Sequence, residues 1–173
     1  MVDSEEGRGF SYEQRSELEA RQADQDRTLD AMHRLEGALS EAAPGREASW
    51  RDAVLGALSV LEAATADEAA NAARPDSLLS DLARNQPGLR NRARALRLQY
   101  NKLCETISSL RREIEEHEEA GGDFSDVRQR LGWILTALRH QRARESDLIY
   151  EAYFEAFREE LRAHSPPSDP RSS

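Results

Sequence analysis

The sequence predicts an all-α protein, folded as an antiparallel up-down four-helix bundle. The chain has 173 residues, enough for one ordinary domain, and only nine Gly and six Pro. Ala, Leu, Glu and Arg, which favour helices, are abundant. Apolar residues also recur at steps of three and four over several long stretches, which is the periodicity of one helix face. Amphipathic helices joined by short links bury such faces most economically as a bundle.

The composition divides the chain into three parts. We expect residues 1–10 to form a flexible N-terminus, because they are polar and contain two Gly. Residues 11–163 are predicted to form a single four-helix-bundle domain. Residues 164–173 are rich in Pro and Ser, which is typical of a disordered tail.

The first helix is expected over about residues 11–42, because Pro44 and Gly45 follow it. Its apolar residues recur at helical spacing only from Leu29 onward. The front half, residues 13–26, is therefore expected to be too polar for deep burial, and it is a candidate to extend past the bundle.

The second helix is expected to open near Ser49 and to end before Pro75. Its seam of four-three steps is Trp50, Val54, Ala57, Leu61, Ala64 and Glu68. A short connecting helix is expected over residues 76–83, between the second and third helices. Pro87 suits the first turn of the third helix.

The third helix has the longest seam, and Gly121-Gly122 is expected to end it. This seam is Leu89, Ala93, Leu96, Tyr100, Leu103, Ile107, Leu110, Ile114 and His117. Asp123 or Ser125 is expected to cap the fourth helix. The fourth seam is Val127, Leu131, Ile134, Leu138, Gln141, Glu145, Leu148 and Ala152.

Charge and composition exclude several classes of protein. The net charge of −9 disfavours nucleic acid and anionic membrane surfaces as partners. No stretch approaches the ~20 apolar residues of a membrane helix, and residues 1–6 are too acidic for a secretory signal. Cys104 is the only cysteine, which excludes an internal disulfide and is typical of a reducing cytoplasm. We therefore expect a cytoplasmic protein that binds neither nucleic acid nor membrane.

Polar residues interrupt the apolar seams. Glu68 interrupts the second helix, Tyr100 the third, and Gln141 and Glu145 the fourth, while His33 lies beside the apolar stripe of the first. Gln141 and Glu145 are four residues apart and share one helix face. A buried carboxylate is costly unless it is hydrogen-bonded, paired, protonated or bound to metal. Two carboxylates that face one bundle therefore mark the candidate site.

Five segments carry a resemblance to a known family. They are 32–35 (MHRL), Trp50, 78–82 (LLSDL) with Pro87 after it, 96–103 (LRLQYNKL) and 144–153 (RESDLIYEAY). Over residues 28–157 their order resembles a hemerythrin-like (HHE cation-binding) domain. The resemblance implies a bundle in which His and Glu side chains from the four helices hold two iron ions.

The ligand positions of that family transfer only in part. The positions that match are His33, Glu68 and Glu145. The positions where a family His is replaced are Ala64, Tyr100 and Gln141. His140 is one residue off register, and a step of about 100° turns it away from the site. Because alanine cannot coordinate iron and an amide is a poor substitute for imidazole, the resemblance implies a bundle that has lost its di-iron site.

Two functions remain open at this point. We favour a metal-free, non-catalytic binding or regulatory bundle, in which Tyr100 and Gln141 donate hydrogen bonds to the carboxylates and His33 supplies the balancing charge. The alternative is iron or zinc binding, sensing or storage by the reduced set His33, Glu68 and Glu145. An enzyme is not expected, because the sequence has no nucleophile–base pair and no phosphate-binding loop.

Four aromatic residues gather near the end of the fourth helix: Tyr150, Tyr153, Phe154 and Phe157. They either cap the open end of the bundle or form an exposed patch for a protein partner or a homodimer. Cys104 lies off the main seam with no His at helical spacing, so it is expected to be a small packing residue.

Overall fold

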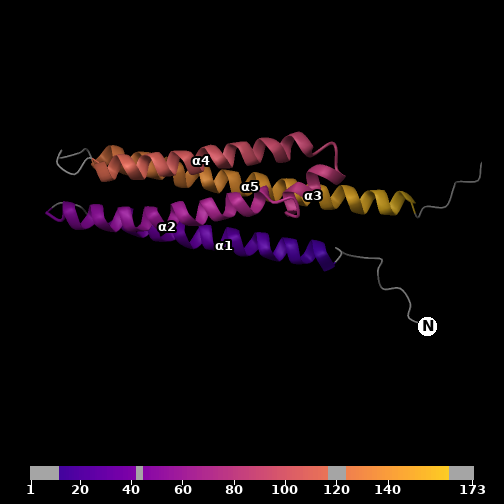
Figure 1. Ribbon diagram of the computed structural model, residues 1–173, viewed down its shortest axis with the longest axis horizontal. Helices are drawn as coiled ribbons and strands as arrows, with labels where there is room; N and C mark the ends of the chain where they lie inside the picture. The colour runs from indigo at the N-terminus through magenta and orange to yellow at the C-terminus, as the bar shows by residue number, and fades with distance from the viewer. Residues whose placement is uncertain (1–11, 42–44, 117–123, 164–173) are drawn as a thin grey trace, which may run out of the picture.

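A computed structural model describes residues 12–41, 45–116 and 124–163, and within these ranges the chain is all-helical, with no β-strand. The long helices are α1 (Tyr12–Ser40), α2 (Glu47–Ala73), α4 (Arg90–Glu116) and α5 (Phe124–Ala163). The short helix α3 (Leu78–Asn85) lies between α2 and α4 in the chain. The four long helices lie side by side along the length of the molecule (Figure 1).

The predicted helix boundaries agree with the structure to within about three residues wherever they are described, but α4 begins at Arg90, so Pro87 lies in the turn before it and not in its first turn. Gly45 precedes α2 with φ of +76°, a left-handed conformation that glycine adopts at little cost. The expectations for residues 1–10 and 164–173 lie outside the described residues. The same holds for Gly121-Gly122 as a helix end and Asp123 as a cap, whereas the other predicted cap, Ser125, lies inside α5.

The connecting helix begins at Leu78, two residues later than predicted, because Ser77 caps it. The Ser77 hydroxyl accepts a hydrogen bond from the backbone N–H of Ser80 (3.2 Å) and donates one to the carbonyl of Ala72 (2.8 Å). The Ser77 hydroxyl thus provides a hydrogen-bond partner both for a carbonyl group at the end of α2 and for an N–H group at the start of α3.

Side chains join the ends of neighbouring helices. Arg51, near the start of α2, donates from Nη2 to the carbonyl of Ile114, near the end of α4 (2.7 Å). Arg130, near the start of α5, pairs with Glu113, also near the end of α4 (Nη2–Oε2 2.7 Å). The end of α4 therefore lies beside the starts of both α2 and α5.

The apolar core is divided into two clusters. The larger core cluster joins α1, α2, α4 and α5, and its fully buried members include Leu35, Leu58, Leu61, Ile107, Leu131 and Ile134. The smaller core cluster packs α3 against the other helices and includes Leu78, Leu79, Leu82, Leu89, Leu96 and Leu148. Burying each such side chain stabilises the fold by about 1.5–3 kcal/mol.

The seam of α2 differs from the predicted one in its middle. Leu58 and Thr65 are buried, whereas Ala57 and Ala64 are half-buried at the edge of the larger core cluster. The predicted seam positions Trp50, Val54, Leu61 and Glu68 are buried, so the inward face of α2 departs from the prediction by one residue only at Leu58 and Thr65.

Candidate functional site

A polar layer lies between the two core clusters. We call it the Arg21 cluster, and its members are Arg21 and Thr28 of α1, Glu68 of α2, Tyr100 of α4 and Glu145 of α5. All five side chains are buried. Along α5, for example, Leu138 belongs to the larger core cluster and Leu148 to the smaller, and Glu145 lies between them in the chain. The sequence thus places charged and hydroxyl groups at one level of the bundle.

The guanidinium of Arg21 bridges the two buried carboxylates. Its Nη2 lies 2.9 Å from Oε1 of Glu68, while Nε and Nη2 each donate to one carboxylate oxygen of Glu145. Burial by itself disfavours the charged form of Arg21, but the hydrogen bonds and charges of Glu145 and Glu68 outweigh it and raise the pKa of the guanidinium. Arg21 is therefore a fixed positive charge inside the bundle.

The second oxygen of Glu68 is satisfied by two hydroxyl groups. Oε2 accepts hydrogen bonds from Oγ1 of Thr28 (2.5 Å) and from Oη of Tyr100 (2.7 Å). Burial, together with the charge and hydrogen bond of Glu68, raises the pKa of Tyr100. The phenol therefore stays protonated and acts as a donor, as predicted for this residue.

The other sequence-predicted donor, Gln141, has a different partner. Its Nε2 donates to the backbone carbonyl of Leu96 at 2.7 Å, so it joins α5 to α4. The prediction that Gln141 donates to the carboxylates is wrong, because the guanidinium of Arg21 already occupies the oxygens of Glu145.

His33 does not reach the Arg21 cluster. Its side chain is exposed, whereas its neighbour Met32 and nearby Leu35 are buried. Successive residues on a helix point about 100° apart, so His33 lies on the outer face of α1. The balancing charge predicted for His33 is supplied by Arg21 instead. His140 is exposed, as its register predicts, and Ala64 is half-buried.

The front half of α1 is more deeply packed than its composition indicates. Arg21 and Asp24 are both buried, so the prediction that residues 13–26 are too polar for burial is wrong for these two. Positions 21, 24, 28, 31 and 35 continue one inward face by steps of three and four. This spacing could have predicted the inward face of α1. The positions in its front half carry polar side chains, so they do not form the apolar stripe by which such a face is usually recognised.

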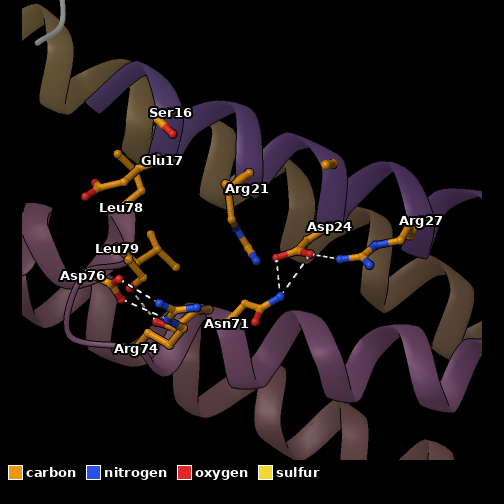
Figure 2. Close-up of a pocket in the computed structure, with 14 residues that line it drawn as sticks. Ser16, Glu17, Arg21, Asp24, Arg27, Asn71, Arg74, Asp76, Leu78 and Leu79 are labelled. Carbon is orange, nitrogen blue, oxygen red and sulfur yellow. Dashed lines mark hydrogen bonds and ion pairs between the residues drawn. The ribbon is translucent and has the colours of Figure 1, made fainter. Parts of the chain in front are cut away.

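Asp24 sits at the edge of the Arg21 cluster. Both of its carboxylate oxygens accept hydrogen bonds from Nδ2 of Asn71 on α2 (3.1 and 3.0 Å), and Arg27 also donates to it. Together these contacts tie α1 to α2 at the border of a groove (Figure 2).

The groove runs between the front half of α1, the end of α2 and the start of α3, and has a volume of about 640 Å³. Glu17 and Arg21 line it from α1, and Leu78 and Leu79 line it from α3 (Figure 2). Within the described ranges, Nη1 of Arg21 and Oε2 of Glu17 are buried atoms without a hydrogen-bond partner. A buried polar atom without a partner is rare in native proteins.

Cys104 packs from α4 against α2. Its Sγ lies 3.6 Å from the carbonyl oxygen of Thr65, and its side chain is half-buried beside the larger core cluster. Burial raises the pKa of the thiol, which lowers the fraction of reactive thiolate. This environment fits the packing role expected for Cys104.

The aromatic residues of α5 are mostly outside the core. Tyr150 and Phe154 are 73% and 52% exposed, and the guanidinium carbon of Arg158 lies 5.8 Å from the centre of the Phe154 ring. Tyr153 is half-buried, and burial raises its pKa to about 12. The side chain of Phe157 lies outside the described part. Tyr150 and Phe154 therefore do not cap the bundle interior.

Both buried carboxylates of the Arg21 cluster are engaged by Arg21. Among the described residues, no group of three or more His, Cys, Asp or Glu is arranged to hold a metal ion. Glu68 and Glu145 each form an ion pair with Arg21.

No described helix is long and apolar enough to cross a membrane.

Comparison of this chain with known proteins identifies no similar protein. No family model, no curated protein and no solved structure matches this chain. The function must therefore be inferred from the residues of the site.

Proposed function

We propose that this chain is a non-catalytic binding or regulatory bundle of hemerythrin-like type, in which Arg21 replaces the metal ions. The observation that carries the proposal is the bridge from Arg21 to Glu68 and Glu145. In a hemerythrin-like domain, carboxylates of the second and fourth helices meet across metal, and Glu68 and Glu145 occupy the positions that resemble them. A guanidinium between two carboxylates balances charge where a cation would otherwise do so.

The order of helix contacts supports the antiparallel up-down arrangement of such a bundle. In that arrangement neighbouring helices run in opposite directions, so the start of one lies beside the end of the other. Arg51 at the start of α2 contacts Ile114 at the end of α4, and Arg130 at the start of α5 contacts Glu113, also at the end of α4.

The groups in and beside the Arg21 cluster support a non-catalytic role. Arg21 is held in its charged form, and the raised pKa values of Tyr100 and Cys104 keep the phenol and the thiol protonated near neutral pH. A general base or nucleophile needs the opposite shift for these side chains. We also propose a cytoplasmic location, since Cys104 has no second cysteine to pair with.

Elemental analysis of protein purified from cells supplemented with iron and zinc tests the proposal. We expect only substoichiometric metal, at the same level in wild type, in Glu145→Ala and in the exposed-site control Asp147→Ala. Near-stoichiometric iron or zinc that is lost in Glu145→Ala but kept in Asp147→Ala would overturn the metal-free proposal. It would favour the alternative of a metal site that includes Glu68 and Glu145, with His33 brought in by a change in α1.

The exposed aromatic side chains are our candidate for a protein interface. Tyr150 and Phe154 are large apolar groups in water, and such residues anchor many interfaces. We propose that this patch supports a homodimer. Sedimentation equilibrium of Tyr150→Ser/Phe154→Ser should show a lower mass than wild type, and an identical mass would remove the patch as the interface.

A further inference from the structure

Positive charge is concentrated in the segment that contains α3 and the first half of α4. Residues 82–104 carry six of the 24 Lys and Arg residues and none of the 33 Asp and Glu residues of the chain. The six are Arg84, Arg90, Arg92, Arg94, Arg97 and Lys102. Because the whole chain has a net charge of −9, the rest of it is more negative still. A basic segment therefore stands out from an acidic protein.

Some of these cations are matched within the fold, whereas others are not. Arg84 pairs with Asp81, and Arg92 pairs with Glu151 on α5. The side chains of three others make no hydrogen bond or ion pair with any residue that the structure describes. These three are Arg94, Arg97 and Lys102. The chain has more acids than bases, so unmatched bases on one helix are unexpected.

A similar run of arginines on α5 differs in this respect. Residues 127–144 contain five arginines and no acid. Each of the five donates to another part of the chain: Arg128 to the carbonyl of Glu41, Arg130 to Glu113, Arg139 to Glu36, Arg142 to the carbonyl of Gln25 and Arg144 to Gln99. These arginines join α5 to its neighbours, whereas the three unmatched cations of α4 join no described elements.

The position of the basic residues also works against the stability of α4. The start of a helix carries a partial positive charge, which favours acidic residues in the first turn. The other four helices contain one each: Glu13, Glu47, Asp81 and Asp126. The first turn of α4 has none and begins with Arg90. Arg94 lies four residues after Arg90 and three before Arg97, a spacing at which like charges repel. Such a local cost is typical of a functional surface.

Three of the exposed residues form a stripe along α4. Arg94, Leu98 and Lys102 are four residues apart, so their side chains follow one another on the same side of the helix. Leu98 is 63% exposed, and Arg94 and Lys102 are exposed on either side of it. The stripe spans about 12 Å of helix. It offers one aliphatic contact between two positive charges.

We propose that this basic face of α4, formed by Arg94, Arg97, Leu98 and Lys102, docks an acidic amphipathic helix of a partner protein. A second helix presents side chains at the same four-residue spacing. Its aliphatic residue packs on Leu98, and carboxylates one turn to either side pair with Arg94 and Lys102. The inference rests on the proposed binding role of the bundle and names its class of partner.

The observations favour a protein partner over nucleic acid. Leu98, at the centre of the stripe, suits an aliphatic side chain and has nothing to offer a phosphate. The negative charge of the rest of the chain also repels a long polyanion. A short acidic helix is affected less, because salt screens charges more than about 8 Å away.

Fluorescence anisotropy with a labelled synthetic helix tests the docking. The probe is a peptide of about 20 residues, long enough to form a helix, with leucine at every fourth position and glutamates flanking it on the same face. A matched peptide has glutamine in place of each glutamate. We expect the glutamate peptide to bind about tenfold more tightly at low salt and to lose most of this advantage in about 0.5 M NaCl. Equal affinity of the two peptides, or no binding of the acidic one, would overturn the proposal.

Charge reversal locates the site. Arg94→Glu should weaken binding of the glutamate peptide by about tenfold or more, since like charges then face each other. Arg34→Glu makes the same change at an exposed position of α1 and should leave the affinity nearly unchanged. Arg94→Glu also places an acid near the start of α4, so its melting temperature should not fall. Equal weakening by Arg94→Glu and Arg34→Glu would contradict a site on α4.

Two further outcomes separate this inference from its alternatives. Tighter binding of duplex DNA than of the glutamate peptide, lost in Arg94→Glu, would overturn the protein partner in favour of a polyanion. A metal-free protein that does not bind the peptide would overturn the partner and leave the proposed function standing. Stoichiometric metal that depends on Glu145 would overturn the proposed function, whatever the peptide does.

Discussion

At the scale of single residues, the Arg21 cluster contains one cation and two carboxylates. Arg21 pairs with both Glu68 and Glu145, so the three side chains together carry one more negative than positive charge. Removing the cation leaves two buried carboxylates without their partner. Removing the charge of Glu145 leaves a balanced pair of Arg21 and Glu68. The two changes should therefore differ in cost.

We expect Arg21→Met to lower the free energy of unfolding by about 3–5 kcal/mol, because it leaves buried charges unpaired. Glu145→Gln should cost less, since the amide keeps the shape and the remaining pair is neutral. Urea denaturation of both variants measures the difference, with the exposed Arg34→Met as the control. A larger loss in Glu145→Gln than in Arg21→Met would contradict this charge assignment.

The hydroxyl of Tyr100 is the next contact to test. Tyr100→Phe removes a hydrogen bond to a buried carboxylate and should cost about 1.5–3 kcal/mol, the usual range for hydrogen bonds to charged groups. Tyr150→Phe, at an exposed position, should have no effect in the same urea melts. Equal stability of Tyr100→Phe and wild type would show that Glu68 does not depend on this donor.

The thiol of Cys104 provides a test of pH dependence. Because burial raises its pKa, the thiolate fraction at pH 8 should be smaller than that of an ordinary cysteine and should grow only at higher pH. Alkylation by iodoacetamide should therefore be slow in the folded protein and fast in urea, and the rate in the folded protein should rise steadily above pH 9. Equal rates in the folded and unfolded protein at pH 8 would contradict a buried thiol.

At the scale of elements, α3 depends on its cap and on the apolar face that Leu78, Leu79 and Leu82 bury. An eight-residue helix is too short to be stable alone, so its first turn must be fixed by other contacts. Ser77 supplies such contacts to both α2 and α3.

Ser77→Ala should therefore cost about 1 kcal/mol, which is typical for loss of an N-cap. Ser109→Ala, at an exposed position within α4, should be neutral or slightly stabilising because alanine is the better helix former. Thermal denaturation of the two variants measures this contrast. The cap would be unimportant if both variants melted at the wild-type temperature.

Features that depend on neighbouring residues in the chain could be predicted from the sequence, whereas features that depend on contacts between helices could not. Gly45 and Pro75 mark helix ends in the sequence itself, so the boundaries of α1 and α2 were predicted well. The burial of Arg21 is not a local property. An arginine on a polar helix face is typical of a surface, and it becomes buried here because Glu68 and Glu145 reach it from two other helices. Glu68, Tyr100 and Glu145 were found because each interrupts an apolar seam.

At the scale of the whole molecule, the Arg21 cluster separates the larger core cluster from the smaller one. A polar layer of this kind can specify the register of packed helices, since sliding one helix by a turn would bury its charge against apolar side chains. Thr28, Glu68, Tyr100 and Glu145 come from all four long helices. The layer therefore fixes the positions of the four long helices relative to one another along the bundle axis. It also places Arg21 at the wall of the groove.

Anomalous diffraction can distinguish the Arg21 guanidinium from a metal ion between Glu68 and Glu145. Crystals grown from protein expressed with added iron and zinc would be measured at the absorption edges of both metals. We expect continuous density for the Arg21 side chain between Glu68 and Glu145, with no anomalous peak there. An anomalous peak between the two carboxylates, with Arg21 turned toward solvent, would contradict it.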